Sequence, residues 1–283
     1  MKKILLFGAS GQVGRELRRT LAPLGELVVS SRGALDLTNV EAIRAAIRQE
    51  RPDIVVNAAA YTAVDQAETE QDLALLTNGK APGIMAEEAG KIDALLVHYS
   101  TDYVFDGAKD SPYHEDDEPN PLSAYGASKL AGERAIRDAE CRHLIFRTSW
   151  VYGLHGKNFL RTMQRLGRER EELKVVVDQI GAPTWSRWIA EATALALRAE
   201  APDGVYHLSC AGSTSWHGFA AAILAAQGWR GHLLPIPSRD YPLPARRPAN
   251  SRLDNHKLHR MLRLALPDWE TALALCLADE ADR

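Results

Sequence analysis

The stretch ILLFGASGQVG at residues 4–14 joins a short apolar strand to a glycine-rich turn and the start of a helix. Gly8, Gly11 and Gly14 follow the pattern Gly-x-x-Gly-x-x-Gly, which permits a tight turn, close approach of the backbone to a pyrophosphate and close packing of helix on strand. The helix N-terminus would present free amide groups to the phosphates. The alternative is a turn that is merely tight, but the strand before it and the amphipathic helix after it favour nucleotide binding.

Strand-like and helix-like segments alternate through the first half of the chain. Aliphatic runs predict strands at 4–7, 27–30, 54–57, 95–101 and 144–148. Helical periodicity predicts helices at 12–23, 39–50, 71–91 and 124–139. Every connection is longer than a hairpin, so this half is expected to be a Rossmann-type α/β fold, a doubly wound parallel sheet with helices on both faces.

The alternation becomes less regular after Trp150. Further elements are predicted as helices at 158–170, 185–199 and 215–227, and as strands at 174–177 and 205–209. Five prolines between residues 235 and 248 favour an extended, stiff loop over a regular element. We interpret the second half as a smaller lobe placed over the carboxyl edge of the sheet.

The composition excludes several classes of protein. With 46% hydrophobic and 25% charged residues among 283, the chain is neither disordered nor fibrous. Its 34 Lys and Arg against 37 Asp and Glu give a net charge of −3, which supplies no bulk attraction to nucleic acid or to an anionic membrane. Three widely spaced cysteines suggest neither a disulfide framework nor a zinc site, and the expected environment is the reducing cytoplasm.

The end of the predicted second strand bears on the choice of dinucleotide. An NAD-specific site often places an acid there, whereas Arg32 suits the 2′-phosphate of NADPH; a solvated loop cation is the alternative. NADPH is therefore favoured and NADH remains possible. Asp36 and Leu37 are placed to contact the adenine, although Asp36 could equally cap the following helix.

A tyrosine and a lysine one helical turn apart carry the predicted chemistry. Tyr125 and Lys129 lie on one face of the helix predicted at 124–139. A phenol with a pKa near ~10 exchanges protons poorly at neutral pH unless a cation favours the phenolate, and Lys129 would supply that cation. Tyr99 and Thr101 are two residues apart in a predicted strand and therefore point to the same side of it. This strand ends at the edge of the sheet where ligands bind.

This order of motifs resembles the extended short-chain dehydrogenases/reductases that act on nucleotide sugars. Segments similar to those of the dTDP-4-dehydrorhamnose reductase family lie at 57–65, 100–107, 146–153 and 245–253. The resemblance runs from residue 3 to about 270. It implies reduction of dTDP-4-dehydro-L-rhamnose to dTDP-L-rhamnose, the last step in the synthesis of that sugar.

The resemblance also implies roles for individual residues. The catalytic set is Thr101, Tyr125 and Lys129. The cofactor contacts that it implies are Gly11, Gln12, Val13, Asp36, Leu37, Ala60, Tyr61, Thr62 and Tyr99. The glycine spacing and the end of the second strand add Gly8, Gly14 and Arg32, and Tyr125 and Lys129 complete the set. The substrate contacts are Thr101, Asp102 and Trp150, to which the fork-shaped donors Arg246 and Arg247 are added as a hypothesis for binding the pyrophosphate. Chemically, a ketone needs a hydride on carbon, which the nicotinamide supplies, and a proton on oxygen, which Tyr125 supplies.

The expected domains follow from these assignments. Residues 1–150 form the NADP(H)-binding domain, completed by about 184–200, and residues 151–183 and 201–283 form the lobe that binds the nucleotide sugar. Some members of the family are described with a magnesium ion that bridges a dimer through two acids. Glu16 matches the first acid, but Arg187 stands at the second position, so we expect no Mg²⁺ and a monomer or weak homodimer.

Two other functions remain open from the sequence. The chain could reduce or epimerise another 4-keto-6-deoxy nucleotide sugar, or it could be a non-catalytic regulatory subunit that binds a dinucleotide. The intact residues Thr101, Tyr125 and Lys129 disfavour the regulatory subunit.

Replacing Arg32 tests the expected preference for NADPH. Arg32→Ala should raise the KM for NADPH much more than the KM for NADH, because the guanidinium would make bidentate contacts with the 2′-phosphate alone. Steady-state kinetics with both cofactors measure this, and equal changes in the two constants would remove Arg32 from the site.

Overall fold

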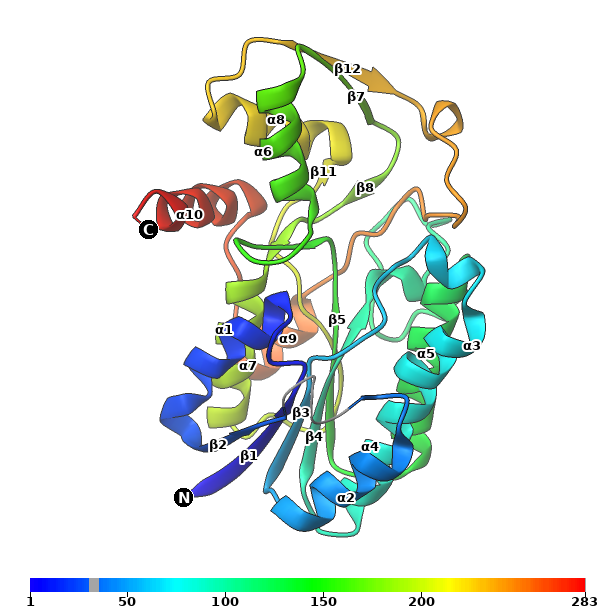
Figure 1. The fold of residues 1–283 in the computed structure, drawn as a ribbon, viewed down its shortest axis with the longest axis vertical. Helices are drawn as coiled ribbons and strands as arrows, with labels where there is room; N and C mark the ends of the chain where they lie inside the picture. The colour runs from blue at the N-terminus through cyan, green and yellow to red at the C-terminus, as the bar shows by residue number, and fades with distance from the viewer. Residues whose placement is uncertain (31–35, 283) are drawn as a thin grey trace.

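The computed structural model describes residues 1–30 and 36–282 and is built on a six-stranded parallel sheet (Figure 1). The strand order is β10-β5-β4-β3-β1-β2. The strands are β1 (Lys2–Phe7), β2 (Gly25–Val29), β3 (Ile54–Asn57), β4 (Leu95–Thr101), β5 (His143–Thr148) and β10 (Gly204–His207). The first five coincide with the strands predicted in the first half, and the doubly wound parallel sheet is confirmed.

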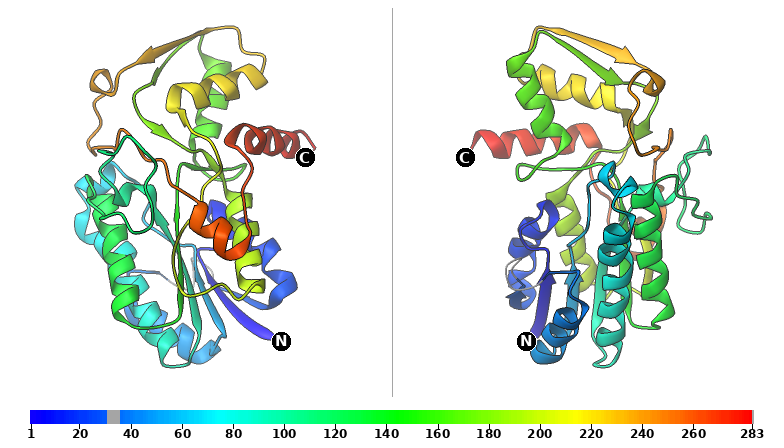
Figure 2. Two further views of the ribbon diagram at one scale, coloured as in Figure 1. Left: turned by 180° about the vertical axis from the view of Figure 1, so that it is seen from behind. Right: turned by 45° about the vertical axis from the view of Figure 1, so that its right-hand side comes forward.

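Helices cover both faces of this sheet, as the two views in Figure 2 show. One face packs against α1 (Gln12–Thr20), α7 (Ser186–Arg198) and α9 (His256–Leu262). The other packs against α2 (Val40–Glu50), α4 (Ala81–Gly90) and α5 (Ala124–Asp138). Because successive side chains of a strand point to opposite faces, Leu6 enters the first core and Leu5 the second.

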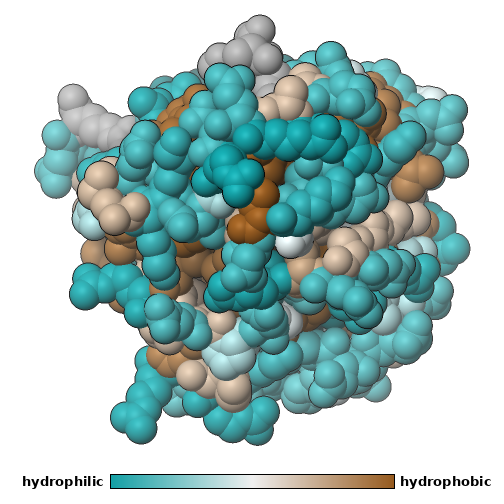
Figure 3. Space-filling view, turned by 90° about the horizontal axis from the view of Figure 1, so that it is seen from below, coloured by the Kyte–Doolittle hydropathy of each residue, from teal (hydrophilic) through white to brown (hydrophobic). Residues whose placement is uncertain are grey.

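A second hydrophobic unit lies at the top of Figure 1 and has its own core. It contains α6 (Phe159–Glu169), α8 (Trp216–Ala226), α10 (Trp269–Ala281), β7 (Glu172–Val176) and β12 (His232–Ile236). Two short strand pairs connect it to the sheet: β6 (Val151–Tyr152) with β9 (Thr184–Trp185), and β8 (Ile180–Gly181) with β11 (Thr214–Ser215). We call this unit the upper lobe. The face seen from below, at the opposite end of the molecule, carries mostly hydrophilic side chains (Figure 3).

The chain after residue 200 does not all enter this lobe, and the predicted assignment of 201–283 to the lobe is wrong for two elements. Strand β10 pairs with β5 in parallel, which places Tyr206 in the core between the sheet and the helices α1, α7 and α9. Helix α9 packs Leu258 into the same core. The start of the proline-rich stretch also differs from prediction, because Pro235 lies in β12, which pairs with β7 in a two-stranded sheet. Both strands of such a sheet are edge strands, where a missing amide hydrogen is tolerated.

The helix predicted at 71–91 is interrupted. It consists of α3 (Gln71–Leu75), a π-helical turn at Leu76–Lys80, and α4. Pro82 has no amide hydrogen to donate to the carbonyl of Asn78, so regular α-helical bonding cannot continue through this point. Gly132 of α5 fits against that carbonyl, where a Cβ would lie only 2.1 Å from the oxygen. Among the described helices, none is long and apolar enough to cross a membrane.

Three cations bind one buried carboxylate and tie α2 to α4. Glu88, which is 1% exposed, accepts from Arg48 Nε at 2.6 Å, Lys91 Nζ at 2.7 Å and Arg44 Nη1 at 2.7 Å. These hydrogen bonds, led by that of Arg48, lower the pKa of Glu88 to about 2.

Glu88→Gln is therefore expected to destabilise the protein by about 1–3 kcal/mol at neutral pH, because the hydrogen bonds lose their charge. The folded-state pKa lies below the unfolded value, so this stabilisation is complete above about pH 5 and disappears as the pH falls toward 2. Chemical denaturation of both proteins across this range measures it. A difference that stays constant from pH 7 to pH 2 would contradict the assignment.

Candidate functional site

The strand order reverses between β1 and β3, and a cleft of about 970 Å³ opens at this point, above the carboxyl ends of the strands. The segments that follow two adjacent strands leave in opposite directions there, which is where open α/β sheets bind ligands. Most of the predicted cofactor contacts line the cleft: Gly8, Gly11, Gln12, Val13, Asp36, Leu37, Ala60, Tyr61, Thr62, Tyr99, Tyr125 and Lys129. Among the described residues, the predicted positions that do not line it are Gly14, Thr101, Asp102, Trp150, Arg246 and Arg247. Arg32 lies outside the described residues.

The glycine turn shapes one wall of the cleft. Gly8 has φ +78°, and a Cβ there would lie 2.4 Å from the amide nitrogen of Ala59. At Gly14 a Cβ would lie 2.1 Å from the carbonyl oxygen of Gly8, so Gly14 allows the helix to pack closely without facing the cleft. Helix α1 has no side-chain cap at Gly11, which leaves its first amides free to bind phosphate. The turn and the cleft therefore fit a dinucleotide.

The residues expected at the adenine end have local partners. Asp36 Oδ1 accepts from the amide of Thr38 at 2.9 Å, while Asn39 caps α2 by accepting from the amide of Ala42 at 3.1 Å. The helix cap is thus Asn39 and not Asp36.

Asn78 is a residue of the site that the sequence reading missed. Its Oδ1 accepts from the amide of Tyr61 at 2.8 Å, and its Nδ2 donates to the carbonyl of Tyr61 at 2.9 Å and to Ser128 Oγ at 3.0 Å. It fixes the loop after β3 against α5, at the residue before Lys129. Only the π-helical turn places Asn78 there, and periodicity did not predict that turn.

Thr101 and Asp102 end β4 in a buried polar cluster. The hydroxyl of Thr101 donates to Asp102 Oδ1 at 3.0 Å, and Ser149 Oγ donates to Asp102 Oδ2 at 3.2 Å. Burial raises the pKa of Asp102 to about 6, against hydrogen bonds from Ser251, Thr101 and Ser149 that lower it. Ser251 comes from the segment after the proline-rich stretch, so that stretch reaches the site.

Tyr125 and Lys129 stand on α5 as expected, and Thr101 is hydrogen-bonded to Tyr125. Burial raises the pKa of Tyr125 to about 12, so the phenol keeps its proton. We expected Lys129 to favour the phenolate of Tyr125, but its hydrogen bonds go to other groups. Lys129 Nζ donates to the carbonyl of Tyr99 at 2.6 Å and lies 3.2 Å from His98 Nε2, and burial lowers its pKa to about 8.

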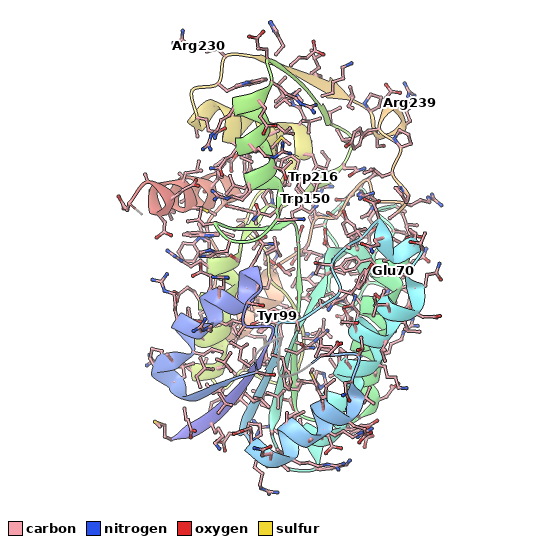
Figure 4. All side chains as sticks on the ribbon, in the orientation of Figure 1. Glu70, Tyr99, Trp150, Trp216, Arg230 and Arg239 are labelled. Carbon is pink, nitrogen blue, oxygen red and sulfur yellow. The ribbon has the colours of Figure 1, made fainter. Side chains whose placement is uncertain are left out.

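Trp150 connects the end of β5 to the upper lobe. Its ring stacks on Trp216 with centroids 3.6 Å apart and planes 4° apart, and the labelled pair in Figure 4 lies between the sheet and the lobe. Trp150 has φ +46°, which is strained for a bulky residue, and its partner Trp216 begins α8.

The two arginines after the proline-rich stretch have different surroundings. Arg247 makes a bidentate ion pair with Asp65, at 3.1 Å and 2.8 Å, and also bonds to Tyr103. Arg246 is exposed. Arg247 already holds a carboxylate, which disfavours it as a ligand of the pyrophosphate. Pyrophosphate binding by Arg246 stays a prediction.

Glu16 stands at the first of the two positions expected for a metal-binding acid, and Arg187 forms an ion pair with it. Arg187 Nε bonds to Glu16 Oε2 at 3.2 Å, and its Nη atoms bond to Asp279 at 2.9 Å and 3.0 Å. The guanidinium therefore neutralises both carboxylates and ties α1 and α7 to α10.

Comparisons with known proteins agree with this site. The model of the RmlD substrate binding domain family matches residues 1–281. The chain belongs to this family. It is 50% identical to the dTDP-4-dehydrorhamnose reductase of Burkholderia thailandensis, covering 98% of each chain, and 47% identical to that of Escherichia coli K12, covering 95% of each. The resemblance inferred from the motifs is confirmed.

Solved structures show the same fold. The crystal structure of dTDP-4-dehydrorhamnose reductase from Bacillus anthracis in complex with NADP superposes with a TM-score of 0.94 at 36% identity, covering 98% of this chain and 99% of that one. The Clostridium acetobutylicum structure of the same name also gives 0.94, at 37% identity, covering 99% of this chain and 100% of that one.

Removal of divalent metal tests the role of Arg187. We expect full turnover after extensive chelation and no change in oligomer mass, because a guanidinium held on Glu16 and Asp279 repels a cation. Activity assays and light scattering with and without EDTA measure both. A large loss that Mg²⁺ restores would show that a metal site exists.

Proposed function

We propose that this chain uses NADPH to reduce the C4 ketone of dTDP-4-dehydro-L-rhamnose, giving dTDP-L-rhamnose. The observation that carries the proposal is a protonated phenol, Tyr125, beside a cleft that fits a dinucleotide and hydrogen-bonded to Thr101. The names of relatives at 50% and 47% identity, and of the NADP complex, support the same substrate and cofactor.

Each part of the molecule has a task in this proposal. The sheet, with α7, β10 and α9, binds NADPH through the residues that line the cleft and through Arg32, while Gly14 lets α1 pack closely on the glycine turn. The upper lobe binds the dTDP-linked sugar, with Thr101, Asp102, Trp150 and Arg246 as contacts and Arg247 holding Asp65 in place. The protein works in the cytoplasm as a monomer or weak homodimer.

The bound dihydronicotinamide supplies the hydride for the ketone carbon. The residues of this chain manage the charge and the proton that the oxygen then requires. Tyr125 gives the proton, because burial raises its pKa to about 12 and the phenol is protonated at neutral pH. To stabilise the developing alkoxide, Thr101 turns its one hydroxyl hydrogen from Asp102 Oδ1 to the substrate oxygen.

Asp102 contributes through its own protonation state. Burial brings its pKa to about 6, so it is mostly ionised at pH 7 and accepts from the hydroxyls of Thr101 and Ser149. Its charge also raises the pKa of Tyr125, which helps to keep the phenol in its acidic form.

Tyr125→Phe tests the proton donor. Turnover should fall by roughly 10²–10⁴-fold, the usual value of general acid catalysis, whereas the affinity for NADPH should change little because the ring remains. Single-turnover NADPH oxidation and a fluorescence titration of cofactor binding measure the two quantities.

Tyr206→Phe is the matched control, because its hydroxyl bonds to the carbonyl of Pro202 away from the cleft. It should retain the wild-type rate. A Tyr125→Phe variant as fast as wild type would refute the mechanism. A wild type that binds NADPH but reduces no 4-keto nucleotide sugar would refute the enzyme and favour a regulatory subunit.

A further inference from the structure

The loop that leads from the sheet into the upper lobe also reaches the cofactor cleft. Residues 153–158 join β6 to α6, and Gly156 and Lys157 of this loop line the cleft. The sequence predicted that residues 151–183 bind the sugar and named neither of the two as a cofactor contact. Gly156 has φ +73°, a conformation that favours glycine, so the chain turns sharply at the wall of the cleft.

Asn158 holds this loop in place. Its Nδ2 donates to Gln12 Oε1 at 2.8 Å and to the carbonyl of Gly153 at 2.8 Å. Its Oδ1 accepts from the amide of Arg161 at 3.1 Å and so caps α6. One side chain therefore connects the loop, the start of α6 and the first residue of α1.

Both chain neighbours of Lys157 contact Gln12. Asn158 does so through its hydrogen bond, and a Cβ added at Gly156 would lie 3.6 Å from Gln12 Cγ. Gln12 begins α1, whose first amides have no side-chain cap and are free to bind phosphate. Lys157 is therefore held beside the helix end at which a dinucleotide places its pyrophosphate.

The charges around the cleft leave this position to Lys157. Among the lining residues that the structure describes, the charged ones are Asp36, Lys129 and Lys157. Lys129 is 2% exposed and donates to the carbonyl of Tyr99 at 2.6 Å. Lys157 is exposed, and within the described part of the chain its ammonium forms no hydrogen bond or ion pair. Both phosphates of a pyrophosphate are negatively charged, and an ammonium is a strong partner for such an anion.

We propose that Lys157 binds the pyrophosphate of the dinucleotide and that Asn158 is a positioning residue, which holds Lys157 there through Gln12. This inference rests on the proposed use of NADPH and adds a contact from outside the sheet. The dinucleotide site then includes the segment that leads into the upper lobe. Binding of the cofactor fixes this segment, because its charge attracts Lys157 toward the start of α1.

The first test measures the affinity for the cofactor in the absence of the sugar. Lys157→Met keeps an apolar stem and removes the charge, so the Kd values for NADPH and for NADH should each rise roughly tenfold. Both dinucleotides contain the pyrophosphate, which is why both should be affected. Lys157→Arg should restore most of the affinity. Titrations that follow the fluorescence of the reduced nicotinamide give the four constants.

Lys174→Met is the matched control, because Lys174 is an exposed lysine on β7 of the upper lobe. It should bind both dinucleotides as the wild type does. A Lys157→Met variant with wild-type affinities would overturn this inference alone. A wild type that binds neither dinucleotide would overturn the proposed cofactor, and this inference with it.

Smaller ligands identify the phosphate that Lys157 binds. ADP contains a diphosphate, 2′-AMP contains only the 2′-phosphate, and dTDP represents the nucleotide of the sugar substrate. Calorimetric titration should show that Lys157→Met weakens the binding of ADP and leaves 2′-AMP and dTDP unchanged. A loss confined to 2′-AMP would assign Lys157 to the 2′-phosphate, and a loss confined to dTDP would assign it to the substrate; either result would refute the proposal.

A double-mutant comparison tests the positioning role of Asn158. Asn158→Ser retains a hydroxyl that can cap α6 but is too short to reach Gln12. In this background Lys157→Met should weaken the binding of NADPH much less than it does in the wild type. Gln12→Leu removes the same hydrogen bond from the other side and should have the same consequence, so it decides the question if Asn158→Ser does not fold. A full tenfold effect of Lys157→Met in these backgrounds would refute the positioning role.

Discussion

The reversal of strand order between β1 and β3 is the constraint on which the rest of the structure depends. Chain segments must diverge at that point, so a cleft forms above the carboxyl ends of the strands. The glycine turn after β1 and the loop after β3 become its walls. The ends of the paired strands β4 and β5 then bring Thr101 and Trp150 to the same edge of the sheet. The upper lobe lies above that edge (Figure 1).

Burial gives this edge its chemistry. The same removal of water that stabilises the core keeps the phenol of Tyr125 protonated, brings Asp102 to a pKa of about 6 and brings Lys129 to about 8. Each shift follows from the cost of charge in a place with little solvent, modified by a few hydrogen bonds. These pKa shifts are therefore consequences of packing, and not of unusual residues.

The sequence predicted those parts that depend on local pattern. The runs that became β1, β3, β4 and β5 are buried on both faces and contain consecutive apolar residues, and the glycine turn has a fixed spacing. Tyr125 and Lys129 were found because one helical turn separates them. Asn78 was missed because Pro82, about three turns into an apparently continuous helix, interrupts its regular hydrogen bonding. The pair of Arg247 with Asp65 joins residues far apart in the chain, and β10 was placed in the lobe because only its pairing with β5 shows that it belongs to the sheet.

The central claim is that this chain transfers a hydride from a nicotinamide to the C4 carbon of a dTDP-linked 4-keto sugar. The most direct measurement uses NADPH deuterated at the reactive carbon of the nicotinamide, together with dTDP-4-dehydro-L-rhamnose prepared enzymatically. Mass spectrometry and NMR of the sugar product locate the label. The account predicts dTDP-L-rhamnose with one deuterium at C4. A product without deuterium at C4, or NADPH that stays reduced while the protein binds it, would contradict it.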